Sequence, residues 1–191
     1  AKIRLKLYLC TTMRTLVHIH DLSFAPFISE TTIQTRVKEL AAQLDAEYAG
    51  KNPIFLAVLN GAFMFAADLF KQLTCQPELS FVKVSSYVCT KSSGRVDELI
   101  GLQTSLKKRH VIVIEDILDT GVTMDKIFTL LESEQPDSLS ICSMLLKPYS
   151  YKGKHQPKYI GFEIEDQFVV GYGLDYKEHG RELPAVYQLI N

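Results

Sequence analysis

The sequence predicts an α/β fold in which a parallel, doubly wound sheet is flanked by helices. Residues 54–59 and 111–114 are continuous apolar runs, which are typical of strands covered on both faces. Each run is followed by a glycine-containing turn and then by residues at helical spacing, so strands and helices alternate along the chain. Ligands of such sheets bind at the carboxyl ends of the strands, and the turns after these strands are therefore the first candidate sites.

The first half of the chain supplies its elements in a regular order. Apolar residues at helical spacing predict a helix over 31–48, with Thr31 and Gln34 as the expected capping box and Gly50 as the stop. Beyond it, the same patterns predict a buried strand at 54–59, a helix at 62–73, a strand at 80–84 and a mobile segment, without apolar rhythm, at 90–97.

The second half continues the alternation and then changes character. After the strand at 111–114, a helix is expected around 127–131 and a buried strand at 140–146, followed by a linker at 148–158. Residues 159–191 predict short strands and little helix. We expect this segment to form most of a small C-terminal, β-rich hood over the ligand edge of the sheet.

Length and charge limit the class of protein. The 191 residues fit one domain, expected at 13–191, with residues 1–12 as an N-terminal extension ahead of Met13. A net charge of −1 provides no broad attraction to nucleic acid or to an anionic membrane, so neither is an expected partner. Any site for a polyanion must therefore be local.

Cysteine and histidine spacing argues against a metal or disulfide framework. The four cysteines include no CxxC pair and are not densely spaced, which suits a reducing cytoplasm. His18 and His20 alternate with apolar residues and so suit a strand; a metal pair there is the alternative, but it lacks a third ligand nearby.

The segment after the strand at 111–114 has the composition of a site for a phosphorylated sugar. Glu115 and Asp116 are adjacent carboxylates expected where the strand leaves the sheet, and they repel each other unless hydroxyls or a cation lie between them. The following turn, residues 119–123, combines hydroxyls, a glycine and the start of a helix, which together suit an anion. The alternative is an ordinary turn in which Thr123 caps the helix.

This segment carries a resemblance to a known family. Residues 114–124, IEDILDTGVTM, resemble the phosphoribosyl pyrophosphate motif of the type I phosphoribosyltransferases, and the expected fold is that of this family. The resemblance implies that Glu115 and Asp116 contact the ribose hydroxyls and magnesium. It also implies that Asp119 carries the proton of purine N7. The implied 5′-phosphate loop comprises Asp119, Thr120, Gly121, Val122 and Thr123.

A second loop resembles another part of the same site. Leu59 to Ala62 is similar to the family's pyrophosphate loop, which contains a cis peptide between its first two residues. Asn60 stands where the family often has lysine, and binding through the backbone amides of Asn60 and Gly61 tolerates that change. A simple glycine turn is the alternative.

Ser86 and Tyr87 match a Ser-Tyr pair that folds over the reacting centre in the purine branch of this family. A lid there would exclude water from an activated sugar donor. The alternative is a surface loop with no part in catalysis.

Residues 158–184 near the C-terminus resemble the purine-binding hood of hypoxanthine-guanine phosphoribosyltransferases. The resemblance implies that Phe168 stacks on the base, that Val169 and the Asp175 region contact the purine edge, and that Lys147 donates to the 6-oxo group. It further implies that Asp175 is a magnesium-linked acid and that Arg181 contacts pyrophosphate. Taken singly, such residues are usually ordinary core or surface side chains.

The resemblance therefore implies a magnesium-dependent enzyme of purine salvage. It would transfer the 5-phosphoribosyl group from phosphoribosyl pyrophosphate to N9 of hypoxanthine and guanine, and it would work as a homodimer or homotetramer. The alternatives are a preference for xanthine and guanine, or an RNA-binding regulator of pyrimidine genes on the same fold. The near-neutral charge disfavours the regulator.

Overall fold

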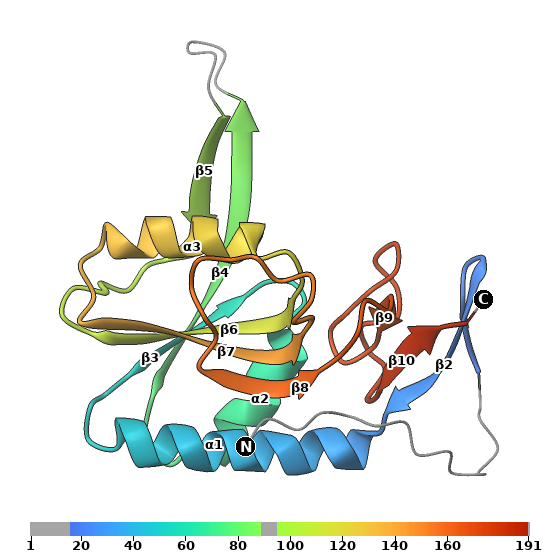
Figure 1. The fold of residues 1–191 in the computed structure, drawn as a ribbon. Coiled ribbons are helices and arrows are strands. Elements are labelled where there is room, and N and C mark those ends of the chain that lie inside the picture. The colour runs from blue at the N-terminus through green and yellow to red at the C-terminus, as the bar shows by residue number, and fades with distance from the viewer. Residues whose placement is uncertain (1–15, 89–94, 191) are drawn as a thin grey trace.

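The computed structural model describes residues 16–88 and 95–190, and its largest unit is a six-stranded sheet (Figure 1). Five strands are parallel, and β5, at one edge, runs antiparallel to β4. The predicted α/β class with a mainly parallel sheet is confirmed. In their order across the sheet the strands are β5 (Arg95–Ile100), β4 (Glu78–Val88), β3 (Ile54–Val58), β6 (His110–Leu118), β7 (Ser138–Leu146) and β8 (Tyr159–Glu163).

Helices cover both faces of this sheet. In Figure 1, α1 (Glu30–Tyr48) and α2 (Phe63–Gln72) lie on one face and α3 (Val122–Glu132) lies on the other. Alternate residues of β6 accordingly enter different cores: Ile112 and Ile114 pack with α1 and α2, whereas Val111 and Val113 pack with α3. Burial on both sides explains why these strands are continuous apolar runs.

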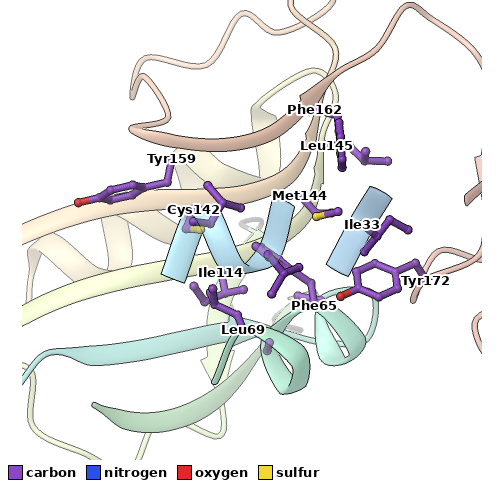
Figure 2. Packing of buried hydrophobic residues seen from close by; sticks show 14 of the residues in the cluster. Ile33, Phe65, Leu69, Ile114, Cys142, Met144, Leu145, Tyr159, Phe162 and Tyr172 are labelled. Atoms are coloured by element: carbon purple, nitrogen blue, oxygen red, sulfur yellow. The ribbon is translucent and has the colours of Figure 1, made fainter. Parts of the chain in front are cut away.

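The core beneath α1 and α2 reaches from the sheet toward the hood. Figure 2 shows Phe65 and Leu69 of α2 pointing into the same core as Ile114 of β6 and Met144 of β7. Tyr172, from the C-terminal segment, also enters this core, where it is buried. The hood is therefore packed onto the same core as the central sheet.

The start of α1 differs from the prediction. Ser29 is the N-cap, with extended backbone, and its Oγ accepts a hydrogen bond of 3.2 Å from Thr32 N. The predicted capping box of Thr31 and Gln34 is wrong, since both residues lie inside the helix and Gln34 donates to a side chain of α2. Ser29, Thr31 and Thr32 could each cap a helix. Because β2 ends at Ile28, Ser29 is the first of them after the strand and becomes the N-cap.

A second, antiparallel sheet forms the hood at one end of the central sheet (Figure 1). Its strand order is β1 (Val17–Ile19), β2 (Leu22–Ile28), β10 (Val186–Leu189) and β9 (Val169–Val170). Ile19, Phe24 and Val170 form its own small core.

The origin of the hood strands differs from the expectation that residues 159–191 build most of it. Residues 159–163 form β8, the edge strand of the central sheet, and half of the hood strands come from residues 17–28. The backbone of β8 is fixed there by Arg36 of α1, whose guanidinium donates to the carbonyls of Ile160 and Gly161 at 2.8 and 2.9 Å. Because β8 is mostly buried and parallel to β7, its apolar run belongs to the central layer.

The predicted lid and mobile segment fall at the β4–β5 hairpin. Residues 95–97, expected to lack regular structure, belong to β5, where Asp97 and Val96 pair with Ser86 and Tyr87 of β4. Residues 89–94, and the predicted extension at 1–12, lie outside the described residues. The side chains of Ser86 and Tyr87 are also outside the description, so their role as a lid stays a prediction. Within the described ranges, no helix has both the length and the apolar character to cross a membrane.

Candidate active site

The site begins where β6 extends past its neighbour β3. The last pair between these strands joins Ala57 to Ile114, whereas β6 continues beside β7 as far as Leu118. Glu115 is paired with Ser143 of β7, so the prediction that the acids lie beyond the strand is wrong. The prediction ended the strand at Ile114 because the apolar run ends there. The strand continues because its backbone pairs with β7, and this pairing does not require apolar side chains. Beyond Ile114, β6 therefore pairs with β7 and no longer with β3.

Glu115 and Asp116 are acids in a buried environment. Glu115 is 8% exposed, and one carboxylate oxygen of Asp116 accepts a hydrogen bond of 2.7 Å from Ile117 N. Burial raises the pKa of Glu115, and the neighbouring charge of Asp116 raises it further. Burial also raises the pKa of Asp116, although the charge of Arg181 acts in the opposite direction. The pair is incompletely compensated, which favours a guest that supplies hydroxyl donors or positive charge.

Two glycines allow the loop after β3 and the hood to approach this acid pair. A Cβ atom added at Gly61 would lie 1.6 Å from a carboxylate oxygen of Asp116, and one added at Gly173 would lie 2.0 Å from the carbonyl oxygen of Gly61. The Leu59–Asn60 peptide is cis, as the resemblance implied. Gly173 was not among the predicted residues. The sequence shows a glycine two residues before Asp175, but it does not show that this glycine contacts Gly61, which is distant in the chain.

Residues 119–123, which we call the phosphate cradle, connect β6 to α3. Gly121 has a φ of +89° and is the N-cap, so Thr123 lies within the helix and the alternative in which it caps the helix is wrong. Because glycine has no side chain, the N-cap leaves amides of the first turn available to a ligand. Apart from Gly121, the cradle residues are exposed. The start of α3 therefore has the exposed, uncapped N-terminus at which anions commonly bind.

A neighbouring loop supports the cradle from behind. A Cβ atom at Gly121 would lie 2.6 Å from Gly153, so the two backbones are in close contact. Lys152 N donates to Thr120 O at 3.0 Å, and Lys154 N donates to the carboxylate of Asp125 at 2.9 Å. The predicted linker is thus a fixed loop that holds the cradle against α3.

The structure brings together Lys147 and Asp119, two of the residues that the resemblance assigns to the purine. Lys147 Nζ lies 2.7 Å from a carboxylate oxygen of Asp119. The lysine side chain is 11% exposed and the aspartate side chain 48%, so the carboxylate is the more accessible of the two. They directly follow the adjacent strands β7 and β6, and Lys147 N donates to Leu118 O at 2.9 Å. A donor and an acceptor for a heterocycle therefore stand side by side.

The hood places Arg181 and Asp175 on the side of the acid pair. Arg181 forms an ion pair of 2.7 Å with Asp175 and donates to Gly173 O at 2.8 Å. The second carboxylate oxygen of Asp175 accepts from Glu178 N at 2.8 Å. Since Gly173 also contacts Gly61, Gly173 links Arg181 of the hood to the predicted pyrophosphate loop.

Phe168 presents an aromatic surface from the hood. Phe168 is 43% exposed, while Val169 next to it is buried and pairs with Gln188 of β10. The ring packs within the hood against Phe24 and Tyr176. An exposed ring on an ordered sheet suits a planar ligand.

The predicted magnesium residues do not form one protein cage. Among the described residues, no three His, Cys, Asp or Glu side chains are arranged to hold a metal ion together, so Glu115, Asp116 and Asp175 do not converge on one point. Magnesium is commonly bound by one or two carboxylates together with substrate phosphates and water. The acidic oxygens here fit that mode, in which the cation is held jointly with a phosphorylated substrate.

Comparison with known proteins identifies the class. Residues 29–177 match the model of the phosphoribosyl transferase domain, and the chain belongs to this family. Within the family, it is 42% identical over 168 residues to a hypoxanthine-guanine phosphoribosyltransferase of Bacillus subtilis (strain 168), covering 87% of this chain and 93% of the relative. It is 40% identical over 159 residues to a hypoxanthine-guanine-xanthine phosphoribosyltransferase of Tritrichomonas foetus, covering 83% and 87%.

A solved structure shares the fold over most of the chain. The crystal structure of a hypoxanthine phosphoribosyltransferase from Staphylococcus aureus matches with a TM-score of 0.79 at 40% identity, covering 86% of this chain and 90% of that one. The family resemblance predicted from the two loops and the hood segment is thus confirmed.

Proposed function

We propose that this protein is a magnesium-dependent enzyme of purine salvage that converts hypoxanthine and guanine to IMP and GMP. It transfers the 5-phosphoribosyl group of phosphoribosyl pyrophosphate to N9 of the base and releases pyrophosphate. The observation that carries this proposal is the grouping of three features at one sheet edge: a buried acid pair, an open helix N-terminus and the Lys147–Asp119 pair. The relatives named above support the choice of base.

The donor sugar is bound by the segment from Glu115 to Thr123. The 5′-phosphate accepts hydrogen bonds from amides at the start of α3, whose dipole favours negative charge. Ribose hydroxyls donate to Glu115 and Asp116, which relieves the repulsion between these buried carboxylates. The pyrophosphate group lies at the loop of Asn60 and Gly61, within reach of Arg181.

The base is bound between the sheet edge and the hood. Phe168 stacks on the purine, and backbone groups at Val169 and Asp175 contact its edge. Lys147 donates to the 6-oxo group; because an ammonium group has no acceptor, it disfavours the 6-amino group of adenine. Asp119, which already accepts from Lys147, lies on the N7 side of a base in this position.

The chemical step joins N9 to the anomeric carbon. That bond forms as the bond from the same carbon to the pyrophosphate oxygen breaks, and the leaving oxygen keeps the electron pair. Asp119 accepts the N7 proton of the base or stabilises its charge. Magnesium, when bound with the donor, offsets the charge of the leaving pyrophosphate. Ser86 and Tyr87 are proposed to exclude water during this step.

An assay with phosphoribosyl pyrophosphate, magnesium and each of hypoxanthine, guanine, xanthine and adenine tests the proposal. We expect turnover of hypoxanthine and guanine, and we expect Asp119→Asn to lower kcat by about 10²- to 10⁴-fold. Asp137→Asn, at an exposed site before β7, is the matched control and should leave kcat unchanged. Failure to form IMP, together with an Asp119→Asn variant equal to the parent, would contradict the proposal.

We also propose how the protein assembles and where it is located. Assembly as a homodimer or homotetramer and a location in the cytoplasm are usual for this family, and Cys75 and Cys142 are free thiols in the structure. Light scattering on the purified protein measures the oligomeric state directly. A monomer at micromolar concentration would contradict the first of these proposals.

A further inference from the structure

Tyr176 contacts the exposed aromatic ring of the hood from one edge. The ring centroids of Phe168 and Tyr176 are 5.9 Å apart and their planes meet at 83°, an edge-to-face arrangement. Phe24, which is buried in the core of the hood, lies 6.1 Å from Phe168 between ring centroids, with an interplanar angle of 45°. Phe168 is therefore supported by one buried ring and restrained by a second ring.

Tyr176 is itself held by the N-terminal hairpin. Its hydroxyl donates to Asp21 Oδ1 at 3.1 Å, and Lys177 Nζ donates to the same oxygen at 3.0 Å. The backbone of Tyr176 exchanges hydrogen bonds of 2.9 and 3.1 Å with His179, and its ring lies 6.0 Å from that of His20. The turn between β1 and β2 thus fixes a residue that contacts the predicted base platform.

We propose that Tyr176 is a positioning residue that sets the plane of the Phe168 ring for stacking on the purine. This inference rests on the proposed function, in which Phe168 contacts the base. A phenyl ring with a free face rotates about its terminal torsion, which has a broad energy minimum. The edge of Tyr176 limits this rotation before the base arrives, and such pre-organisation strengthens binding.

The contacts of Tyr176 predict an effect on the base and not on the sugar donor. The Asp175–Arg181 ion pair is fixed by bonds to Gly173 O and Glu178 N, which do not involve the Tyr176 side chain. Loss of the tyrosine ring therefore leaves the pyrophosphate side in place. A general weakening of the hood would instead affect both substrates.

Steady-state kinetics on three variants provide the first test of this inference. For Tyr176→Leu we expect the KM for hypoxanthine to rise about threefold to tenfold, the range that corresponds to a lost aromatic pair. The KM for phosphoribosyl pyrophosphate should stay unchanged, and kcat should stay within about twofold. Tyr176→Phe keeps the ring and should remain close to the parent. Tyr187→Leu is the matched control, because Tyr187 is a half-buried tyrosine of the same small hood core.

A double variant separates positioning from simple packing. If Tyr176 acts through Phe168, then Tyr176→Leu should add little to the KM of a Phe168→Leu variant, whereas independent contributions would multiply. Should Tyr176→Leu fail to fold, Tyr176→Met replaces it with the same expectation.

The outcomes distinguish the inference from the function on which it rests. Phe168→Leu raising the KM for hypoxanthine while Tyr176→Leu does not would overturn the inference alone. Equal changes in both KM values for Tyr176→Leu would also overturn it. A parent enzyme that accepts no purine would instead refute the proposed function.

Discussion

The phosphate cradle and the hood serve adjacent parts of one proposed reaction, but they are built in opposite ways. The cradle is a single segment, residues 119–123, that follows a central strand and is supported by a neighbouring loop. The hood joins residues 17–28 to residues 169–189, and its central pairing is between β2 and β10. A contiguous site keeps its geometry through local backbone bonds, whereas a composite site depends on the closure of a long chain.

The largest effect is expected at Gly173, where the hood contacts the loop after β3. In Gly173→Ala the new Cβ would collide with the carbonyl of Gly61, so we expect kcat/KM to fall by at least about 100-fold and stability by about 1–3 kcal/mol. Gly50→Ala is the control: its φ is also positive, but a Cβ there has no atom within 4 Å. Equal activities of the two variants would show that the hood and the β3 loop need not touch.

The next effect concerns the hydrogen bond that anchors the hood to α2. The Tyr172 hydroxyl donates to Asp68 at 2.9 Å, and Tyr172→Phe leaves the ring in the core while removing this bond. We expect a loss of about 1.5–3 kcal/mol in urea unfolding, since the acceptor is a carboxylate. Tyr187→Phe, at a half-buried tyrosine of the hood core, is the control and should leave the free energy of unfolding nearly unchanged. If both variants unfold alike, the hood does not depend on α2 for its attachment.

At the acid pair we expect a smaller change in stability, and in the opposite direction. Because burial raises the pKa of Glu115, its ionised form destabilises the free protein, and this penalty appears as the pH rises above about 4.5. Glu115→Gln should therefore increase stability by about 0.5–2 kcal/mol at neutral pH in magnesium-free buffer, with the gain vanishing at lower pH, while activity falls. Thermal unfolding at several pH values measures this change.

Glu47 provides the comparison for that prediction. Hydrogen bonds from Lys158 and Tyr159 lower the pKa of Glu47, so its contribution to stability is present at neutral pH and is lost as the pH falls. Glu47→Gln should consequently destabilise the protein where Glu115→Gln stabilises it. Destabilisation by both variants would contradict the assignment of Glu115 as an incompletely compensated acid.

The smallest effect is expected at Val122 in the cradle. Val122 is 60% exposed, and the proposed binding at the cradle uses backbone amides, so Val122→Thr should leave kcat/KM within about twofold and stability within about 0.5 kcal/mol. Steady-state assays and urea unfolding measure the two quantities. A larger loss of activity would show that a side chain, and not only the backbone, determines the local geometry.

The sequence could predict what is encoded locally. The apolar runs located β3 and β6, and the contiguous motif located the cradle, because each depends on residues close together in the chain. The family and its fold followed from these same segments and were confirmed.

What could not be predicted depends on pairing between distant segments. No local signal indicated that residues 17–28 would join the hood, that Gly173 would contact Gly61, or that Tyr176 would be fixed by Asp21. The extension of β6 past Ile114 was missed for a related reason. This part of β6 is held by pairing with β7, and the two acids after Ile114 interrupt the apolar pattern by which a strand is predicted.

The place of β10 in the hood sheet has a consequence for biosynthesis. β10 lies between β2 and β9, yet its residues, 186–189, are translated after every other strand described here. A nascent chain can therefore complete the central sheet and the phosphate cradle well before the hood sheet receives β10. We expect translation products that stop before Val186 to retain the donor-binding half of the site while lacking a functional seat for the purine.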